Sequence, residues 1–153
     1  MSETAPCFSV IIPAYNRAEP LRGAIASVLA QSYQDFEIVI VDDGSKDDPR
    51  AVAESFGDPR IRFFRQENRG GGAARNSAID AARGRFITPL DSDDIFLPHH
   101  LRAMKELLEG KENTVGYARM VVDRGGCRTF LKPPRAIRAG EHMATYLLCD
   151  RGF

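Results

Sequence analysis

The sequence predicts an α/β domain with three layers and a mostly parallel sheet, and three observations support this fold class. Continuous apolar runs of strand length alternate along the chain with stretches in which an apolar residue recurs every three or four positions. Runs without polar alternation are typical of strands that are buried on both faces of a parallel sheet. Acidic residues also gather directly after two of the expected strands, where α/β sheets bind their ligands.

The chain begins with a strand, a helix and a second strand. We expect the first strand at residues 8–12, ended by Pro13, and the second at residues 36–41, ended by an Asp-Asp-Gly turn. The segment between them carries apolar residues at the spacing of one helical face, namely Leu21, Ala24, Ile25, Val28 and Leu29. A strand–helix–strand unit of this kind is right-handed by default.

The alternation continues through the middle of the chain. We expect a short helix at residues 51–56, a strand at residues 61–65, an alanine-rich helix at residues 73–82 and a buried strand at residues 85–90. Pro98 then opens a further helix, because proline suits the first helical turn. The apolar face of that helix is formed by Leu101, Met104, Leu107 and Leu108. Four strands that alternate with four helices favour a three-layer arrangement.

The pattern of apolar and polar residues changes after residue 110, so we divide the chain into residues 1–110 and residues 111–153. In the second part we expect strands at residues 115–122 and 127–131, joined by a glycine turn, and a helix at residues 141–149. The chain ends directly after this apolar helix, which still needs something to pack on. We therefore expect the sequence to be incomplete at its C-terminus.

Composition and charge restrict the possible functions. Lys and Arg together number 21, as do Asp and Glu, so no net charge attracts the protein to nucleic acid. The first residues lack the basic start and the apolar stretch of a secretion signal, and no apolar run approaches the roughly 18 residues that cross a bilayer. Three cysteines without CxxC spacing fit a reducing compartment. We therefore expect a cytoplasmic protein.

A basic stretch leaves one membrane contact open. Six Arg and Lys side chains between residues 119 and 138 are accompanied by a single acid, Asp123. Such a stretch is either a solvated face or a surface that meets anionic lipid or a phosphorylated acceptor. The second possibility would bring the protein to the inner face of the membrane as a peripheral protein.

Two turns at expected strand ends carry candidate binding residues. Tyr15 follows the first strand, where an aromatic ring can stack on a flat base, although a half-buried turn residue would look the same. Asp42 and Asp43 are adjacent carboxylates that repel each other, an arrangement that needs a ligand donor, a metal or water. The alternative is that an Asp side chain closes the turn or caps the next helix.

A third acidic turn, Asp91-Ser92-Asp93-Asp94, directly follows the buried strand expected at residues 85–90. In an extended segment, residues i and i+2 point to one side, so Asp91 and Asp93 can share one cation. Carboxylate oxygens suit hard ions such as Mg²⁺ and Mn²⁺ and leave coordination positions for phosphate oxygens. An exposed acidic turn without a metal is the alternative.

A glycine-rich segment at residues 68–76 opens the alanine-rich helix. Glycines at a helix start expose backbone N–H groups to an anion, and Arg69 or Arg75 can add charge-assisted hydrogen bonds. A flexible turn with solvated arginines is the alternative. The spacing matches neither the GxGxxG fingerprint nor a P-loop.

Four segments, FSVIIPAYNR, FEIVIVDDGS, NRGGGAARNSAI and GRFITPLDSDDIFLP, resemble in order and spacing the donor-binding half of the inverting glycosyltransferases of family 2. The resemblance covers residues 8–108. It implies the Rossmann-like GT-A fold of nucleotide-diphospho-sugar transferases, a UDP-sugar as donor, and Mg²⁺ or Mn²⁺ as cofactor. It also implies that residues 1–110 bind the donor and that residues 111–153 begin the acceptor side.

The resemblance further implies roles for the residues at the first two strand ends. Pro13 and Tyr15 match positions that border the nucleotide base, with Tyr15 stacking on it. Asp43 matches the acid that contacts the uracil. Asp42 matches its less directly engaged neighbour, which we include among the residues expected to bind the nucleotide sugar.

The same resemblance assigns the later motifs. Asp91 and Asp93 match a DxD-like motif, with Asp93 as the direct metal ligand and Asp91 nearer the ribose and the sugar. Arg75 matches a basic position near the donor. The implied reaction is metal-assisted transfer of a hexosyl group to an acceptor hydroxyl with inversion, as in the synthesis of cell-surface polysaccharide or glycoconjugates. The acceptor, a saccharide, lipid or protein, and the oligomeric state are not encoded in any motif.

One feature of the family has no match in this chain. An inverting transfer needs a general base, which the family supplies from an acid well beyond the DxD-like motif. None of the acids after Asp94 stands in a matching context: Glu106, Glu109, Glu112, Asp123, Glu141 and Asp150. We therefore expect the base beyond Phe153 and no transfer by this chain alone.

Two other functions remain as alternatives. The chain could be a non-catalytic module that binds a nucleoside diphosphate and transfers nothing. It could also be a phosphotransferase with Asp91 as nucleophile and Asp93 as acid. That chemistry normally has its DxD motif on the first strand, whereas here the motif follows the fourth.

Overall fold

A computed structural model describes residues 5–111, 114–116, 120–124 and 127–131. The elements in chain order are β1 (Phe8–Ala14), α1 (Ala18–Leu29), β2 (Phe36–Asp42), α2 (Pro49–Glu54), β3 (Ile61–Arg65), α3 (Gly71–Ala81), β4 (Phe86–Pro89), α4 (His100–Leu108), β5 (Met120–Arg124) and β6 (Cys127–Leu131). Residues 1–112 and residues 113–153 form separate compact units.

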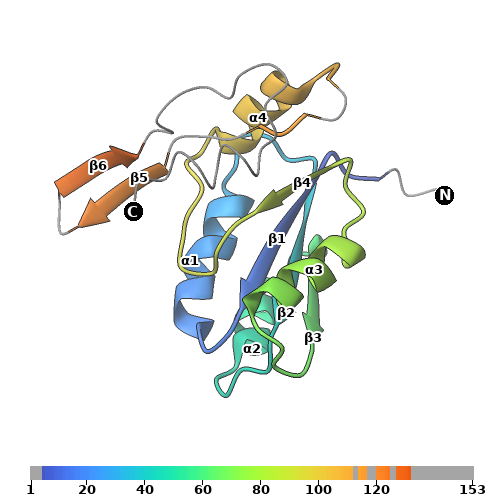
Figure 1. The fold of residues 1–153 in the computed structure, drawn as a ribbon, viewed down its shortest axis with the longest axis vertical. Coiled ribbons are helices and arrows are strands. Elements are labelled where there is room, and N and C mark those ends of the chain that lie inside the picture. Colours follow the sequence, from blue (N-terminus) through green and yellow to red (C-terminus); the bar gives the residue numbers. More distant parts are fainter. Residues whose placement is uncertain (1–4, 112–113, 117–119, 125–126, 132–153) are drawn as a thin grey trace, which may run out of the picture. The chain divides into compact units, whose positions relative to one another are not determined.

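The first unit contains a parallel sheet with the strand order β3-β2-β1-β4 (Figure 1). β1 pairs with β2 along its whole length, from Phe8 opposite Phe36 to Ala14 opposite Asp42. Its pairing with β4 is shorter and ends where Ile11 lies opposite Pro89. All pairings in this sheet are parallel, so the carboxyl ends of its strands meet at one edge.

Helices cover both faces of this sheet and complete the three layers (Figure 1). On one face, apolar residues of α1, α2 and α4 form a single core with alternate residues of β1 and β2. On the other face, Ala74 and Ala78 of α3 pack against Ile11, Val39 and Val41. The predicted α/β fold class with a mostly parallel sheet is thereby confirmed.

Several element boundaries differ from those expected, each for a local reason. β1 continues through Pro13, because proline needs no N–H where the strand has left its β4 partner. α2 begins at Pro49 rather than at residue 51, since the Asp48 side chain accepts a hydrogen bond from the Ala51 N–H and caps it. α3 begins at Gly71, two residues earlier than expected.

Pro98 does not open α4, as we had expected, but lies in the preceding turn. Its carbonyl oxygen accepts a hydrogen bond from the Ser32 N–H, 2.9 Å away. The buried Gln31 side chain donates to the Leu97 carbonyl and accepts from the Leu101 N–H at the start of α4. These contacts from the end of α1 fix where the helix begins.

The prediction that the strand before Asp91 is buried was wrong. β4 lies at an edge of the sheet, and its residues are at most half-buried, with 43% of Ile87 exposed. A run of apolar residues alone does not reveal whether a strand takes a central or an edge position.

The second unit contains an antiparallel hairpin of β5 and β6, in which Met120 lies opposite Leu131. The predicted strand at residues 127–131 is found, whereas its partner begins at residue 120 rather than at residue 115. The helix expected at residues 141–149 lies outside the described residues. Within the described part of the chain, no helix has the length and apolarity needed to cross a membrane.

Candidate functional site

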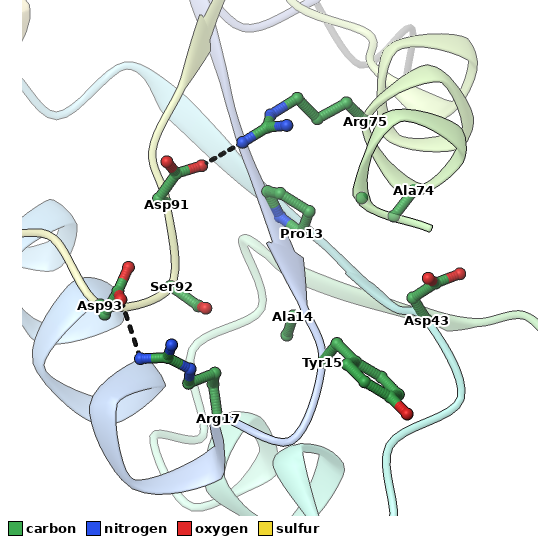
Figure 2. Close-up of a pocket in the computed structure, with 11 residues that line it drawn as sticks. Pro13, Ala14, Tyr15, Arg17, Asp43, Ala74, Arg75, Asp91, Ser92 and Asp93 are labelled. Carbon is green, nitrogen blue, oxygen red and sulfur yellow. Dashed lines mark hydrogen bonds and ion pairs between the residues drawn. The ribbon is translucent and has the colours of Figure 1, made fainter. Parts of the chain in front are cut away.

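A pocket of about 200 Å³ lies at the carboxyl edge of the sheet (Figure 2). The ends of β1, β2 and β4 and the first turns of α3 supply its walls. Six residues that the sequence had singled out line it: Pro13, Tyr15, Asp43, Arg75, Asp91 and Asp93. The pocket is also lined by Ala14, Arg17, Gly71, Ala74 and Ser92, whereas Asp42 is not among its lining residues.

Tyr15 is held in place by the residue that follows it. Asn16 has a φ of 51°, in the left-handed region that asparagine tolerates better than most side chains. Its N–H donates to Ser45 Oγ at 2.9 Å, and its Oδ1 accepts from the Lys46 N–H at 2.8 Å. The loop after β1 is therefore tied to the loop after β2, with the Tyr15 ring 45% exposed beside the pocket.

Asp42 is fully buried, and protein groups contact both of its carboxylate oxygens. Its Oδ1 accepts a hydrogen bond from the Ser45 N–H at 2.9 Å. Arg65 Nη1 lies 2.9 Å from Oδ2, in an ion pair that lacks hydrogen-bond geometry. Arg65 also donates to the Ser45 carbonyl. This arrangement makes Asp42 a closing residue of the turn, which was one of the two readings of the sequence.

Asp43 is 2% exposed and organises the segment that leads into α3. Its Oδ1 accepts from Gln66 Nε2 at 2.7 Å and from the Arg69 N–H at 3.0 Å, and its Oδ2 accepts from the Gly70 N–H at 2.8 Å. Burial acts to raise the pKa of Asp43, but these hydrogen bonds outweigh it and hold the pKa below its ordinary value.

The adjacent carboxylates of Asp42 and Asp43 were expected to need a ligand donor, a metal or water. Protein hydrogen bonds meet this need for Asp43, whereas Asp42 Oδ2 has an ion pair but no hydrogen bond among the described residues. Protein groups contact all four carboxylate oxygens. The two side chains avoid each other because β2 continues through Asp42, so that the neighbours point to opposite sides of the sheet.

The acidic segment after β4 is a turn, not the extended chain on which we based the shared face of Asp91 and Asp93. The Asp94 N–H donates to the Asp91 carbonyl at 3.0 Å. Asp91 and Asp93 nevertheless both line the pocket, and each pairs with an arginine (Figure 2). Arg75 Nη2 lies 2.5 Å from Asp91 Oδ1, and Arg17 Nη1 lies 2.8 Å from Asp93 Oδ2.

Asp94 is exposed and does not line the pocket. Partial burial, followed by the charges of Asp93 and Asp91, raises its pKa above the ordinary value. Among the residues that the structure describes, no group of three or more His, Cys, Asp or Glu side chains is arranged to hold a metal ion.

Arg17 and Asn16 were not among the predicted site residues, although both stand in the AYNR turn next to Tyr15. Their position directly after a strand end was a usable signal. What the sequence lacked was the partner of each residue, since Asp93 and Ser45 lie far away along the chain.

A parallel sheet with a pocket at its carboxyl edge, lined by an aromatic ring, arginines and carboxylates, defines an α/β ligand-binding domain. The chain belongs to glycosyl transferase family 2. The sequence model described as "Glycosyl transferase family 2" matches residues 9–147, which is most of the chain. This confirms the family that the four segments indicated.

Curated relatives agree with this assignment. An uncharacterised glycosyltransferase of Rickettsia felis is 40% identical over 96% of this chain and 25% of its own length. The succinoglycan biosynthesis protein ExoO of Rhizobium meliloti is 45% identical over 68% of this chain and 30% of its own length. The chain thus spans about a quarter to a third of these relatives.

Solved structures of the same fold give a similar picture. The crystal structure of S. aureus TarS 1–349 in complex with UDP-GlcNAc has a TM-score of 0.64 and 30% identity, over 67% of this chain and 31% of TarS. The mannosyltransferase PcManGT from Pyrobaculum calidifontis, in complex with GDP-Man and Mn²⁺, has a TM-score of 0.64 and 26% identity, over 74% of this chain and 34% of PcManGT. The fold is therefore of the GT-A type, as expected.

Proposed function

We propose that this protein transfers a hexosyl group from a UDP-sugar to an acceptor hydroxyl with inversion at the anomeric carbon. The observation that carries the proposal is the convergence of Tyr15, Asp43, Arg75, Asp91 and Asp93 on one pocket. The UDP-GlcNAc complex of TarS supports the choice of donor, and the name of ExoO supports a role in polysaccharide or glycoconjugate synthesis.

The uridine would bind at the end of the pocket that Tyr15 and Asp43 form. The exposed Tyr15 ring offers a face on which a base can stack. Asp43 Oδ2 accepts one hydrogen bond, from Gly70, and retains acceptor capacity for the imide N–H of uracil. The lowered pKa of Asp43 keeps this side chain ionised and therefore an acceptor only.

The charges around the pocket favour a donor that arrives with a divalent cation. Arg17 and Arg75 face three carboxylates, those of Asp43, Asp91 and Asp93. This surplus of negative charge opposes a bare nucleoside diphosphate. A divalent ion makes the net charge of the pocket positive, so the charges of the lining residues favour a bound cation.

Asp93 and Asp91 fit Mg²⁺ or Mn²⁺, because both present half-exposed carboxylate oxygens, the hard ligands that these ions prefer. With Asp93 as the direct ligand and Asp91 nearer the ribose and the sugar, coordination positions remain for diphosphate oxygens and water. When bound, the ion would neutralise the charge that develops on the departing diphosphate. The Mn²⁺ complex of PcManGT supports this choice.

The general base is not among the pocket carboxylates, which all serve the donor side in this proposal. Glu106 and Glu109, on α4 and at its end, do not line the pocket. The pocket volume of about 200 Å³ is also below the roughly 300–1,000 Å³ of complete small-molecule sites. We propose that the base and the acceptor wall come from outside the described residues.

Calorimetry with the 153-residue chain tests the donor site and the metal separately. UDP is expected to bind in the presence of Mn²⁺ and much more weakly in EDTA, with ADP as the control for base selectivity. Equal affinity in EDTA would contradict the metal role. Failure of a folded chain to bind any nucleotide would contradict the donor site.

A non-catalytic module that binds a nucleoside diphosphate is the second candidate. It is favoured by one observation, that the described residues place no carboxylate at the pocket beyond the three on the donor side. The two candidates agree on nucleotide binding and differ in transfer. An extended chain that binds UDP and transfers no sugar to any acceptor would favour this second candidate.

A further inference from the structure

Arg17 reaches across the pocket to Asp93, from the loop after β1 to the turn after β4 (Figure 2). Its Nη1 lies 2.8 Å from Asp93 Oδ2, and the two side chains are 53% and 48% exposed. The carboxylate that best suits a cation therefore already carries a positively charged partner. Arg17 has no role in the proposed function so far.

The backbone on both sides of Arg17 is fixed. The Asn16 N–H donates to Ser45 Oγ at 2.9 Å, and the Ala18 N–H donates to Asp47 Oδ2 at 2.8 Å. Both acceptors lie in the loop after β2. Because these contacts hold the chain, Arg17 can change its partner only by turning its exposed side chain.

A divalent ion and Arg17 compete for Asp93. A guanidinium group has only donors and cannot ligate the ion, so the two positive charges would repel each other at the shared carboxylate. The ion pair between Arg17 and Asp93 is exposed, and such pairs are weak enough to be broken at little cost. A displaced guanidinium group then favours an anion with paired oxygens, and a diphosphate offers them.

We propose that Arg17 is a donor-binding residue that exchanges Asp93 for the diphosphate, and that this exchange couples cation binding to nucleotide binding. The inference rests on the proposed function, since it needs both ligands in this pocket. A cation alone must displace Arg17 without compensation, and a nucleotide alone meets the charges of Asp91 and Asp93. When both ligands are present, the diphosphate gives the displaced Arg17 a new partner, and the cation offsets the charges of Asp91 and Asp93. Each ligand therefore favours the binding of the other.

The coupling is reciprocal by thermodynamic necessity. UDP raises the affinity for Mn²⁺ by the same factor by which Mn²⁺ raises the affinity for UDP. Arg75, which pairs with Asp91, need not move if Asp93 is the direct ligand of the ion. The inference therefore assigns the coupling to Arg17 rather than to both arginines.

The test measures binding rather than activity. Electron paramagnetic resonance measures the concentration of free Mn²⁺ while the 153-residue chain is titrated, with and without UDP. The salt concentration is about 0.15 M, which screens distant charges. In Arg17→Gln, Mn²⁺ alone is expected to bind about two- to fivefold more tightly, because its competitor is gone. UDP in the presence of Mn²⁺ is expected to bind about tenfold more weakly, and the coupling factor falls.

Arg22→Gln is the matched control. Arg22 is an exposed arginine of α1 that contacts Ser55 and does not line the pocket, so its removal is expected to leave both affinities and the coupling factor unchanged. Arg17→Met is a second variant, used if Arg17→Gln fails to fold by circular dichroism.

The outcomes separate the two proposals. An unchanged Mn²⁺ affinity and coupling factor in Arg17→Gln, while the wild type binds UDP with Mn²⁺, would overturn the exchange and leave the proposed function intact. Equal effects of Arg17→Gln and Arg22→Gln would also overturn it, because net charge alone would then explain them. A folded wild-type chain that binds no nucleotide would remove the proposed function and the inference together.

Discussion

Single residues in the pocket combine the binding role proposed for them with a role in local structure. Asp43 is the clearest case, because it accepts N–H groups from Arg69 and Gly70 and also lines the pocket. A substitution of Asp43 would be hard to interpret, because it would disturb the start of α3 as well as the proposed contact with the ligand. Asp93 is a better target, because its side chain is exposed and pairs with Arg17 rather than with the backbone of a neighbouring element.

Asp93→Asn is expected to weaken Mn²⁺-dependent UDP binding by tenfold or more, on the order of the loss of one charged contact. Asp94→Asn is the matched control at the next position, outside the pocket. It is expected to change binding little, because the Asp94 side chain does not line the pocket. Calorimetry with UDP and Mn²⁺ compares the variants, and similar losses in both would show that the wrong carboxylate has been assigned to the metal.

The sequence alone identified most of the pocket residues, but it did not show which of them contact one another. Tyr15, Asp43 and Asp93 all follow strands of one parallel sheet, and that rule alone brings them to the same edge. The partner of Asp93 could not be predicted, since it depends on the turn that aims the carboxylate at Arg17, 76 positions away. Whether Asp42 pointed into the pocket depended on where β2 ended, a boundary that apolar runs define poorly.

At the scale of the elements, a polar cluster ties the loop between α3 and β4 to β1, β2 and β3, at the edge of the sheet opposite the pocket. Ser9 Oγ donates to Glu37 Oε1 at 2.6 Å. The Gly84 N–H donates to Ser9 Oγ at 2.8 Å, and Arg62 Nη1 donates to Glu37 Oε2 at 2.9 Å. These contacts fix the start of β4, and through β4 the turn that carries the pocket acids.

Gly84→Ala is expected to destabilise the fold by about 3 kcal/mol or more, because a methyl group there would lie 2.4 Å from the Ser9 nitrogen. Gly72→Ala is the control. A methyl group at Gly72 meets nothing within 4 Å, and alanine suits α3 better, so the change should be neutral or stabilising by up to about 1 kcal/mol. Urea unfolding gives both values, and equal stabilities would contradict the close approach.

Glu37 makes the stability of the same cluster depend on pH. Burial acts to raise its pKa, but hydrogen bonds from Ser9, Arg62 and the Arg83 N–H outweigh it and lower the pKa from the ordinary 4.5. A lowered pKa means that the contribution to stability is complete above 4.5 and is lost as the pH falls below it. Urea unfolding between about pH 7 and pH 3.5 should show a gap between wild type and Glu37→Gln that closes on acidification. A gap that stays constant over this range would contradict the role of the ionised carboxylate.

The elements themselves were predictable where the pattern was long and continuous. β1 and β2 are buried on both faces, as their apolar runs indicated. α4 began later than expected because Gln31, at the end of α1, binds its first turn, and no local signal near Pro98 carries that information. Contacts between distant segments therefore decide the boundaries that local propensity leaves open.

At the scale of the whole molecule, the residues proposed to bind the donor all lie between positions 13 and 93 of the first unit. The chain spans about a quarter to a third of the length of its relatives, so this pocket alone does not define the activity of a complete protein. The proposed donor site uses only strand ends of this first unit. Transfer also needs a positioned base and a wall that holds the acceptor.

The 153-residue chain is therefore expected to bind UDP-sugar and to leave acceptors unmodified. Loss of the base alone typically costs about 10² to 10⁴ in rate, and loss of acceptor positioning costs more. Slow hydrolysis of the donor could remain, because water needs no acceptor wall. The measurement is transfer from a radiolabelled UDP-sugar to a panel of acceptors, with hydrolysis of the same donor followed in parallel as the control. Transfer well above the rate of hydrolysis would mean that the base lies among the acids after Asp94, and the search would turn first to the four that lie outside the described residues or on the second unit, namely Glu112, Asp123, Glu141 and Asp150.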